Sequence, residues 1–152
     1  MAGWTNKGKY KVLGWGFRAE TPPTNFYVAL VLATGTPNAD INTFGQLPEI
    51  AAGNGYASGG YQIARSTVGF DVWTEDDTND RGLVQCKDCV WTASGGSIPA
   101  SGLGARYAVL TDDNVTIASR EVYAYWDLVS DRTVSVGQTL TLQDCELRIN
   151  EA

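Results

Sequence analysis

The stretch FYVALVLA, residues 26–33, decides the fold class of this chain. It combines β-branched and aromatic residues with no polar position, a composition that favours an extended strand. Apolar side chains would lie on both faces, so we predict a central strand in a sheet that is covered on both sides. No apolar run approaches the roughly 20 residues that span a bilayer as a helix, and we expect no membrane partner.

Further short segments along the chain have the composition of strands, and turn signals separate them. The turns are SGGS, SGLG, TDDN and SVGQ. Seven or so strands with such punctuation predict an all-β protein, a β-sandwich or jelly-roll-like domain with a short N-terminal helix. We expect residues 1–152 to form one domain. The expected strands are YQIARS, an edge piece at Phe70–Trp73, LVQCKDCVW, ARYAVL, REVYAYWDL and QTLTLQDCELRIN.

Alternation within two of these strands predicts their faces. In REVYAYWDL one face would carry Val122, Ala124, Trp126 and Leu128, and the other Glu121, Tyr123, Tyr125 and Asp127. In the last segment the apolar parity changes, and a bulge or bend near Gln143-Asp144 would reconcile its two halves.

The N-terminal segment, residues 1–20, predicts a short helix or arm. Thr5 or Asn6 would cap the helix. Tyr10, Leu13 and Phe17 recur on one helical face, so we expect that face to dock on the core. The helix would end before Pro22, because proline lacks the N–H and restricts the residue before it.

Composition excludes several classes of function. The net charge is −6, and the 11 basic residues are scattered apart from Lys7, Lys9 and Lys11, so we expect no nucleic-acid partner. The chain contains no histidine, which removes Ser-His-Asp and Cys-His catalysis and the commonest metal ligand. No pair of carboxylates stands out as an acid and base. We therefore expect a protein that is not an enzyme, with no catalytic residue and no cofactor.

Cysteines and clustered acids are the remaining candidates for metal chemistry. Cys86 and Cys89 form a CKDC motif, but one further thiol, Cys145, leaves too few ligands for zinc. In a strand the two thiols of CKDC would point to opposite faces, so we predict that one is buried and the other is not. The acidic segment Glu75–Asp80 could bind Ca²⁺, although a solvated acidic turn is the preferred interpretation. We expect no bound metal.

The glycine-rich stretch EIAAGNGYASGGYQIAR, residues 49–65, raises the possibility of a phosphate loop. It lacks the Walker spacing and leads into a strand, so we predict an irregular turn with close backbone approach. Turns of this kind often form interfaces, and Asn54, Gly55 and Tyr56 are our candidates for contact with a partner. Trp4 and Trp15 are hard to assign to the core so close to the N-terminus, and we predict partner contact for them as well.

Three pieces, taken in order, resemble a group of small structural proteins of tailed bacteriophages. They are TPPTNFYVALVLATGTP, then EIAAGNGYASGGYQIAR, then RYAVLTDDN with the C-terminal REVYAYWDLVSDRTVSVGQTLTLQDCELRIN. Members of this group are described as head decoration, head fibre or tail fibre proteins. The resemblance implies a capsid decoration or cement protein that binds the major capsid protein as a homotrimer. It also implies synthesis in the host cytoplasm and a final location on the capsid surface of the virion.

Three alternatives stay open at this point. The first is a head-fibre, neck or tail component, which would be present in few copies. The second is a carbohydrate-binding adhesion module, suggested by the five tryptophans and seven tyrosines. The third is a carboxylate-dependent hydrolase, which would need two acids converging in a cleft.

Overall fold

Strand β2 (Asn25–Leu32) is an interior strand of the larger sheet, as the sequence predicts. The computed structural model describes residues 2–150. In the five-stranded sheet the order is β1 (Ala2–Trp4), β8 (Val122–Arg132), β7 (Ala105–Thr111), β2 and β3 (Tyr61–Ala64). All four pairings are antiparallel. Residues Val28–Val31 of β2 are fully buried, because both faces of this sheet are covered.

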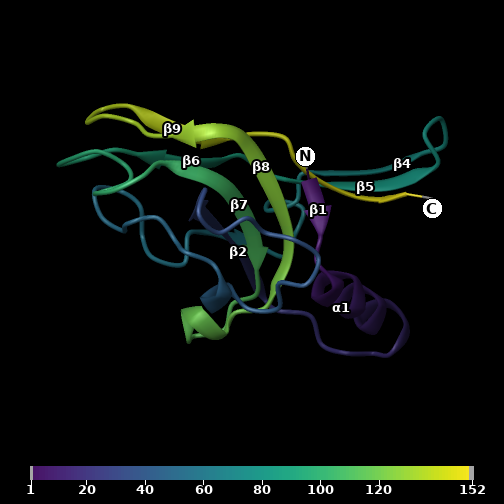
Figure 1. Ribbon diagram of the computed structural model, residues 1–152. Helices are drawn as coiled ribbons and strands as arrows, with labels where there is room; N and C mark the ends of the chain where they lie inside the picture. Colours follow the sequence, from purple (N-terminus) through teal and green to yellow (C-terminus); the bar gives the residue numbers. More distant parts are fainter. Residues whose placement is uncertain (1, 151–152) are drawn as a thin grey trace.

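Two smaller antiparallel sheets complete an all-β fold. One has the order β10 (Cys145–Asn150), β5 (Arg81–Cys86), β4 (Val72–Asp76), and the other pairs β6 (Cys89–Thr92) with β9 (Thr139–Leu142). The expected edge piece is confirmed as the edge strand β4, which starts two residues later than predicted. The hairpin β4–β5 projects from one end of the molecule, and β6 and β9 extend toward the opposite end (Figure 1).

The predicted strand LVQCKDCVW is in fact two strands, and this changes the environment of its thiols. The chain leaves β5 at Cys86 and enters β6 at Cys89, each with a different partner. Both side chains are fully buried, so the prediction that only one would be buried is wrong. Alternation fails here because the chain changes sheets between the two residues. Cys145 is also buried and lies directly opposite Cys86 in the pairing of β10 with β5.

A bulge at the start of β8 changes the predicted faces of that strand. The register with β7 shifts between Leu110 and Thr111, which pair with Ala124 and Val122. Tyr123 and Ala124 therefore both pack in the main core, and Val122 packs on the other side of the sheet. The prediction that Val122 shares a face with Ala124, and that Tyr123 lies on the opposite face, is wrong, because an extra residue in one strand resets the alternation. The predicted bend before the last strand is confirmed, since β9 ends at Leu142 and Asp144 has a positive φ of 52°.

The apolar core lies on both faces of the five-stranded sheet. The main cluster joins Val28 and Leu30 of β2 to side chains of the smaller sheets, including Trp91 and Leu147. A second cluster contains Ala29 and Val31, and it is covered partly by the 3₁₀ turn Phe44–Gln46. A second 3₁₀ turn, Ile117–Ser119, lies in the loop between β7 and β8. Helix α1 (Asn6–Phe17) packs beside β8 at one end (Figure 1).

Candidate interaction surface

Helix α1 docks on the sheet through glycine. Thr5 caps the helix, as predicted: its hydroxyl accepts the Gly8 N–H at 2.9 Å and donates to the Val122 carbonyl at 2.5 Å. The Thr5 N–H donates to the Tyr123 carbonyl at 3.0 Å. A Cβ added to Gly8 would lie 2.1 Å from that same carbonyl oxygen, so only glycine permits this approach of helix to strand.

The face of α1 that we predicted to dock is instead exposed. Tyr10, Leu13 and Phe17 are 60%, 58% and 82% exposed. The buried positions of the helix are Gly8 and Gly14. The prediction is wrong because α1 approaches the backbone of β8 through Gly8, which has no side chain to keep the two apart. The periodicity of apolar residues does not reveal such a contact. An apolar stripe at helical spacing is therefore left at the surface.

Trp15 and Trp4 both pack against the main core, contrary to our expectation that they would be hard to place there. The Trp15 ring meets Phe26 and Tyr123 edge-on, at centroid distances of 6.0 and 5.4 Å. The Trp4 indole N–H donates to the Arg148 carbonyl at 2.7 Å. Contact of either tryptophan with a partner stays a prediction, but both have a structural role within the chain.

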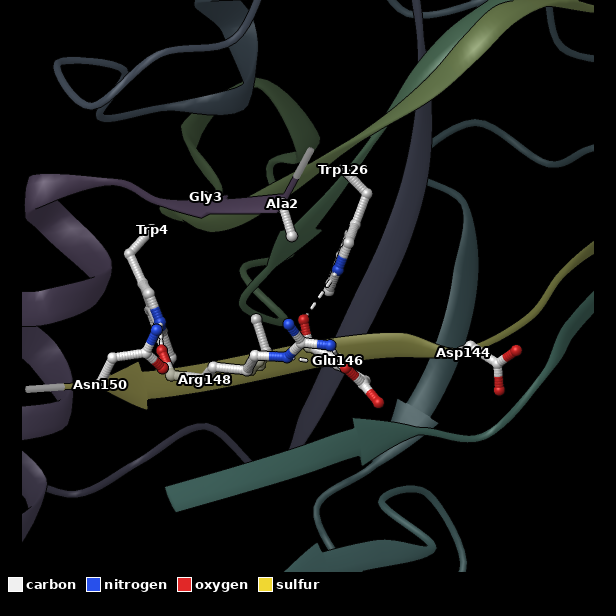
Figure 2. Close-up of a pocket in the computed structure, with 9 residues that line it drawn as sticks. Ala2, Gly3, Trp4, Trp126, Asp144, Glu146, Arg148 and Asn150 are labelled. Carbon is white, nitrogen blue, oxygen red and sulfur yellow. Dashed lines mark hydrogen bonds and ion pairs between the residues drawn. The ribbon is translucent and has the colours of Figure 1, made fainter. Parts of the chain in front are cut away.

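A pocket of about 460 Å³ lies between β1 and β10, where two sheets approach edge to edge (Figure 2). Trp126 also lines the pocket and makes the same kind of contact as Trp4: its indole N–H donates to the Glu146 carbonyl at 3.0 Å. The two indoles thus satisfy carbonyls on the outer edge of β10 that no strand pairs with. This arrangement ties the three-stranded sheet to the five-stranded one and leaves the pocket between them.

Two carboxylates, those of Asp144 and Glu146, line this pocket. Glu146 forms an ion pair with Arg148 on the same strand. Asp144 accepts a long hydrogen bond of 3.4 Å from the Gln85 amide. Figure 2 shows the Asp144 carboxylate pointing away from that of Glu146. Hydrolysis by a carboxylate pair requires two acids that converge on a common point, and these two do not.

The glycine-rich turn is pinned against neighbouring strands, which confirms the predicted close backbone approach. Gly55 has a φ of 109°, and a Cβ there would lie 2.1 Å from the Thr92 carbonyl oxygen. The Asn54 amide donates to the Ser97 carbonyl at 2.9 Å. Among the three candidates of this turn, Asn54 is half-buried and Gly55 is exposed.

Tyr56 is only 2% exposed, so its ring offers no surface to a partner in this structure. Its hydroxyl donates to Glu49 Oε1 at 2.8 Å and accepts the Leu30 N–H at 3.0 Å. Burial, with the Glu49 carboxylate, raises the pKa of Tyr56 well above its ordinary value. The side chain links the turn to β2, which is a structural role.

The three thiols and the acidic hairpin complete the candidates for chemistry. Burial raises the pKa of Cys89 and Cys145 to about 12, so both stay protonated and unreactive at neutral pH. In the acidic hairpin, Asn79 and Arg81 hydrogen-bond Asp76 and hold its pKa below the ordinary range. Within residues 2–150, no three Cys, Asp or Glu side chains are arranged to hold a metal ion.

Trp73 is a surface residue that sequence reasoning missed. It lies on the edge strand β4 and is 89% exposed, more than any other tryptophan of the chain. The sequence did contain an indication that Trp73 is exposed. It stands in the stretch DVWTEDD, which has acids on both sides and lacks the apolar alternation of a strand with one buried face. Tryptophan is among the residues most often found at the energetic centre of protein interfaces.

A second exposed apolar region lies at the opposite end, on the elements around β6 and β9. It comprises Val90 on β6, Leu103 before β7, Val129 on β8 and Val136 in the turn before β9. We call this set the β6–β9 end, and we call the set of Tyr10, Leu13, Phe17 and Trp73 the helical end. The elements that carry these two sets lie at different ends of the molecule (Figure 1). Val68 and Val115 are also exposed and belong to neither set.

Comparison of the chain with models of protein families, with curated proteins and with solved structures gives no match. Within the described residues, no helix has the length and apolar character needed to cross a membrane.

Proposed function

We propose that this protein is a non-enzymatic structural component of a tailed-bacteriophage virion. More specifically, it would be a decoration or cement protein that binds and stabilises the lattice of the major capsid protein on the outside of the head. The proposal starts from the resemblance of three ordered segments to small structural proteins of such phages. In this proposal the protein acts as a homotrimer, because closed symmetric assemblies suit a symmetric shell.

The observation that carries this proposal is that exposed apolar side chains occur on elements at both ends of one β framework. A protein that joins neighbouring subunits needs two contact surfaces, and the buried centre of a contact surface is more apolar than its rim. Leu13 and Phe17 stand at one end, and Val129 and Val136 stand at the other. An enzyme or a simple binding module needs only one such surface.

A rigid two-layer framework would suit the same role. We propose that the five-stranded sheet and the smaller sheets pack as the layers of a β-sandwich. The support is the composition of the main core, which joins Leu30 and Ile63 of the large sheet to Trp91 of β6 and Leu147 of β10. The net charge of −6 would also keep an outer protein from binding packaged DNA.

The carbohydrate-binding alternative has less support. A glycan site built by stacking needs aromatic rings that face solvent. Trp91 and Trp126 are buried, and Trp4 and Trp15 pack against the core, which leaves Trp73, Tyr10 and Phe17 as the strongly exposed aromatic rings. The head-fibre, neck or tail alternative shares the structural role and differs in copy number.

Copy number in purified particles is therefore the first test. Quantitative mass spectrometry against the major capsid protein should give about one copy for every one to few capsid subunits. A ratio of a few copies per particle would replace decoration by the neck or tail role. Absence from particles would overturn the proposal in all its forms.

Add-back to particles that lack the protein tests the lattice contact itself. The wild-type protein should bind until its sites on the shell are filled, and Val136→Asp should bind at least about tenfold more weakly, because a charge would be buried in the contact. Val115→Asp is the matched control, since Val115 is an exposed valine in the loop between β7 and β8. Equal binding of all three proteins would refute a lattice contact at the β6–β9 end.

A further inference from the structure

Helix α1 is a concentrated basic surface on an acidic protein. Residues 6–18 carry three lysines and one arginine and no acid. Lys7 and Lys11 lie 3.5 Å from carboxylate oxygens of Glu121, so their charges are partly met within the chain. Lys9 and Arg18 are exposed, and neither forms an ion pair within residues 2–150. In the chain, Lys9 directly precedes Tyr10 and Arg18 directly follows Phe17, so the two cations flank the exposed stripe of Tyr10, Leu13 and Phe17.

The hairpin β4–β5 has the opposite charge. Residues 71–81 contain five acids and one arginine. Arg81 pairs with Asp76 at 2.7 Å, so that acid is already satisfied. Glu75, Asp77 and Asp80 are exposed and form no ion pair in the described part of the chain. Trp73 stands on the same hairpin with nearly its whole side chain in solvent.

The two surfaces match in chemistry but do not meet within one molecule. Both project from the same end, and the hairpin extends away from the helix (Figure 1). Each combines exposed apolar side chains with uncompensated charge, and the signs are opposite. Such surfaces attract each other over a Debye length and then bury apolar area on contact.

We propose that the β4–β5 hairpin of one copy of this protein docks on helix α1 of a second copy. Trp73 would pack on the stripe of Tyr10, Leu13 and Phe17, and the hairpin carboxylates would face Lys9 and Arg18. The partner is a second copy because this chain itself supplies the acidic, tryptophan-bearing element that the helix fits.

The contact limits the symmetry of the assembly to a few arrangements. The two patches are different surfaces, so a single hairpin-on-helix contact leaves one helix and one hairpin free. The free pair can bind further copies, which gives a ring or a chain, or the two copies can exchange hairpins about a twofold axis, which makes the dimer interface isologous. The inference does not depend on the virion assignment, because it concerns the purified protein alone.

Sedimentation velocity of the full-length protein over a range of concentrations tests the proposal. The wild type should self-associate, and more strongly at low salt than at high salt, since opposite charges draw the surfaces together. Trp73→Ala should weaken association at least about tenfold, as expected of a tryptophan at the centre of an interface. Val115→Ala removes an exposed apolar side chain elsewhere and should leave association unchanged.

A charge exchange identifies the pairing surfaces. Lys9→Glu alone and Asp77→Lys alone should each weaken association, and the double variant should recover at least part of the loss. Because all these side chains are exposed, the thermal midpoint of each variant should stay close to that of the wild type, which separates lost contact from misfolding.

Three results would overturn the proposal. They are a protein that remains a monomer at all concentrations, an oligomer that is insensitive to Trp73→Ala and Lys9→Glu, and a charge exchange with no recovery. These outcomes leave the copy number in particles unaffected, so failure of this contact and failure of the virion role are distinguishable.

Discussion

Gly8→Ala and Gly16→Ala are the same substitution in one helix, and we predict opposite effects on stability. In an isolated helix, alanine is favoured over glycine by about 1 kcal/mol. Gly16 has no atom near its missing Cβ, so Gly16→Ala should stabilise the protein by up to about that amount. At Gly8 the added Cβ would lie 2.1 Å from a backbone oxygen of β8.

The size of the Gly8 effect follows from how little the helix can move. Ordinary contact begins near 3.4 Å, so helix and strand would have to separate by about 1.3 Å, from 2.1 to 3.4 Å. Thr5 opposes this, because its N–H and hydroxyl both bond to carbonyls of the same strand. Overpacking typically costs about 1–3 kcal/mol, and a contact this short against backbone atoms puts Gly8 near 3 kcal/mol, the upper end of that range. After the gain of about 1 kcal/mol in helix propensity, we expect a net loss of about 2 kcal/mol.

Urea denaturation followed by tryptophan fluorescence and far-ultraviolet circular dichroism measures both variants. With a slope of about 2 kcal/mol per molar urea, the midpoint of Gly8→Ala should fall by about 1 M. The midpoint of Gly16→Ala should rise by up to about half that amount. Similar slopes for all three proteins would show that the denatured states are comparable.

A stabilising or neutral Gly8→Ala would refute the reasoning. It would mean that α1 can move away from β8 without cost, and that the close contact is not what fixes the helix. A loss of equal size at Gly16 would also refute it, because the steric explanation requires the two sites to differ.

Three further predictions concern buried polar groups and charge. Tyr56→Phe should destabilise the protein by about 1–3 kcal/mol, since the Leu30 N–H loses its acceptor, and an unchanged urea midpoint would contradict this. The three thiols should be inert to a disulfide reagent at mildly alkaline pH in the native protein and react fully in guanidinium chloride; fast native reaction would contradict their burial. Hydrogen bonding to Arg106 lowers the pKa of Asp127, so its nuclear magnetic resonance titration should have a midpoint below that of a free aspartate. A group with a depressed folded pKa stabilises the fold above its unfolded pKa, and this contribution is lost as the pH falls through the folded value. Arg106→Gln should raise the titration midpoint of Asp127, and a titration midpoint that does not move would show that Arg106 is not the cause of the lowered pKa.

The kind and order of the elements could be predicted from local patterns. The run at residues 26–33 became an interior strand, Thr5 capped a helix, and the parity change near Asp144 marked a bend. Each of these features depends on residues within a few positions of one another. Local sterics and side-chain alternation act over that range, so the sequence determines them directly.

The candidate surface could be predicted only in part. The N-terminal segment was a correct place to look, but the side chains chosen there, Trp4 and Trp15, pack against the core. The exposed residues are the stripe that we expected to be buried, together with Trp73. Which face of a helix docks depends on a strand more than a hundred residues away, and no pattern within the helix contains that information.

The sequence by itself determined that this is an all-β protein with one short capped helix, because propensity and periodicity are local properties. Only the tertiary structure decided which of its apolar side chains are exposed at the surface and which are buried. At Gly8 the absence of a side chain allows the backbone of β8 to approach, and this turns Tyr10, Leu13 and Phe17 toward solvent. The chain crossing from β5 to β6 likewise buries both Cys86 and Cys89. Burial depends on contacts between distant segments, and only the folded chain brings those segments together.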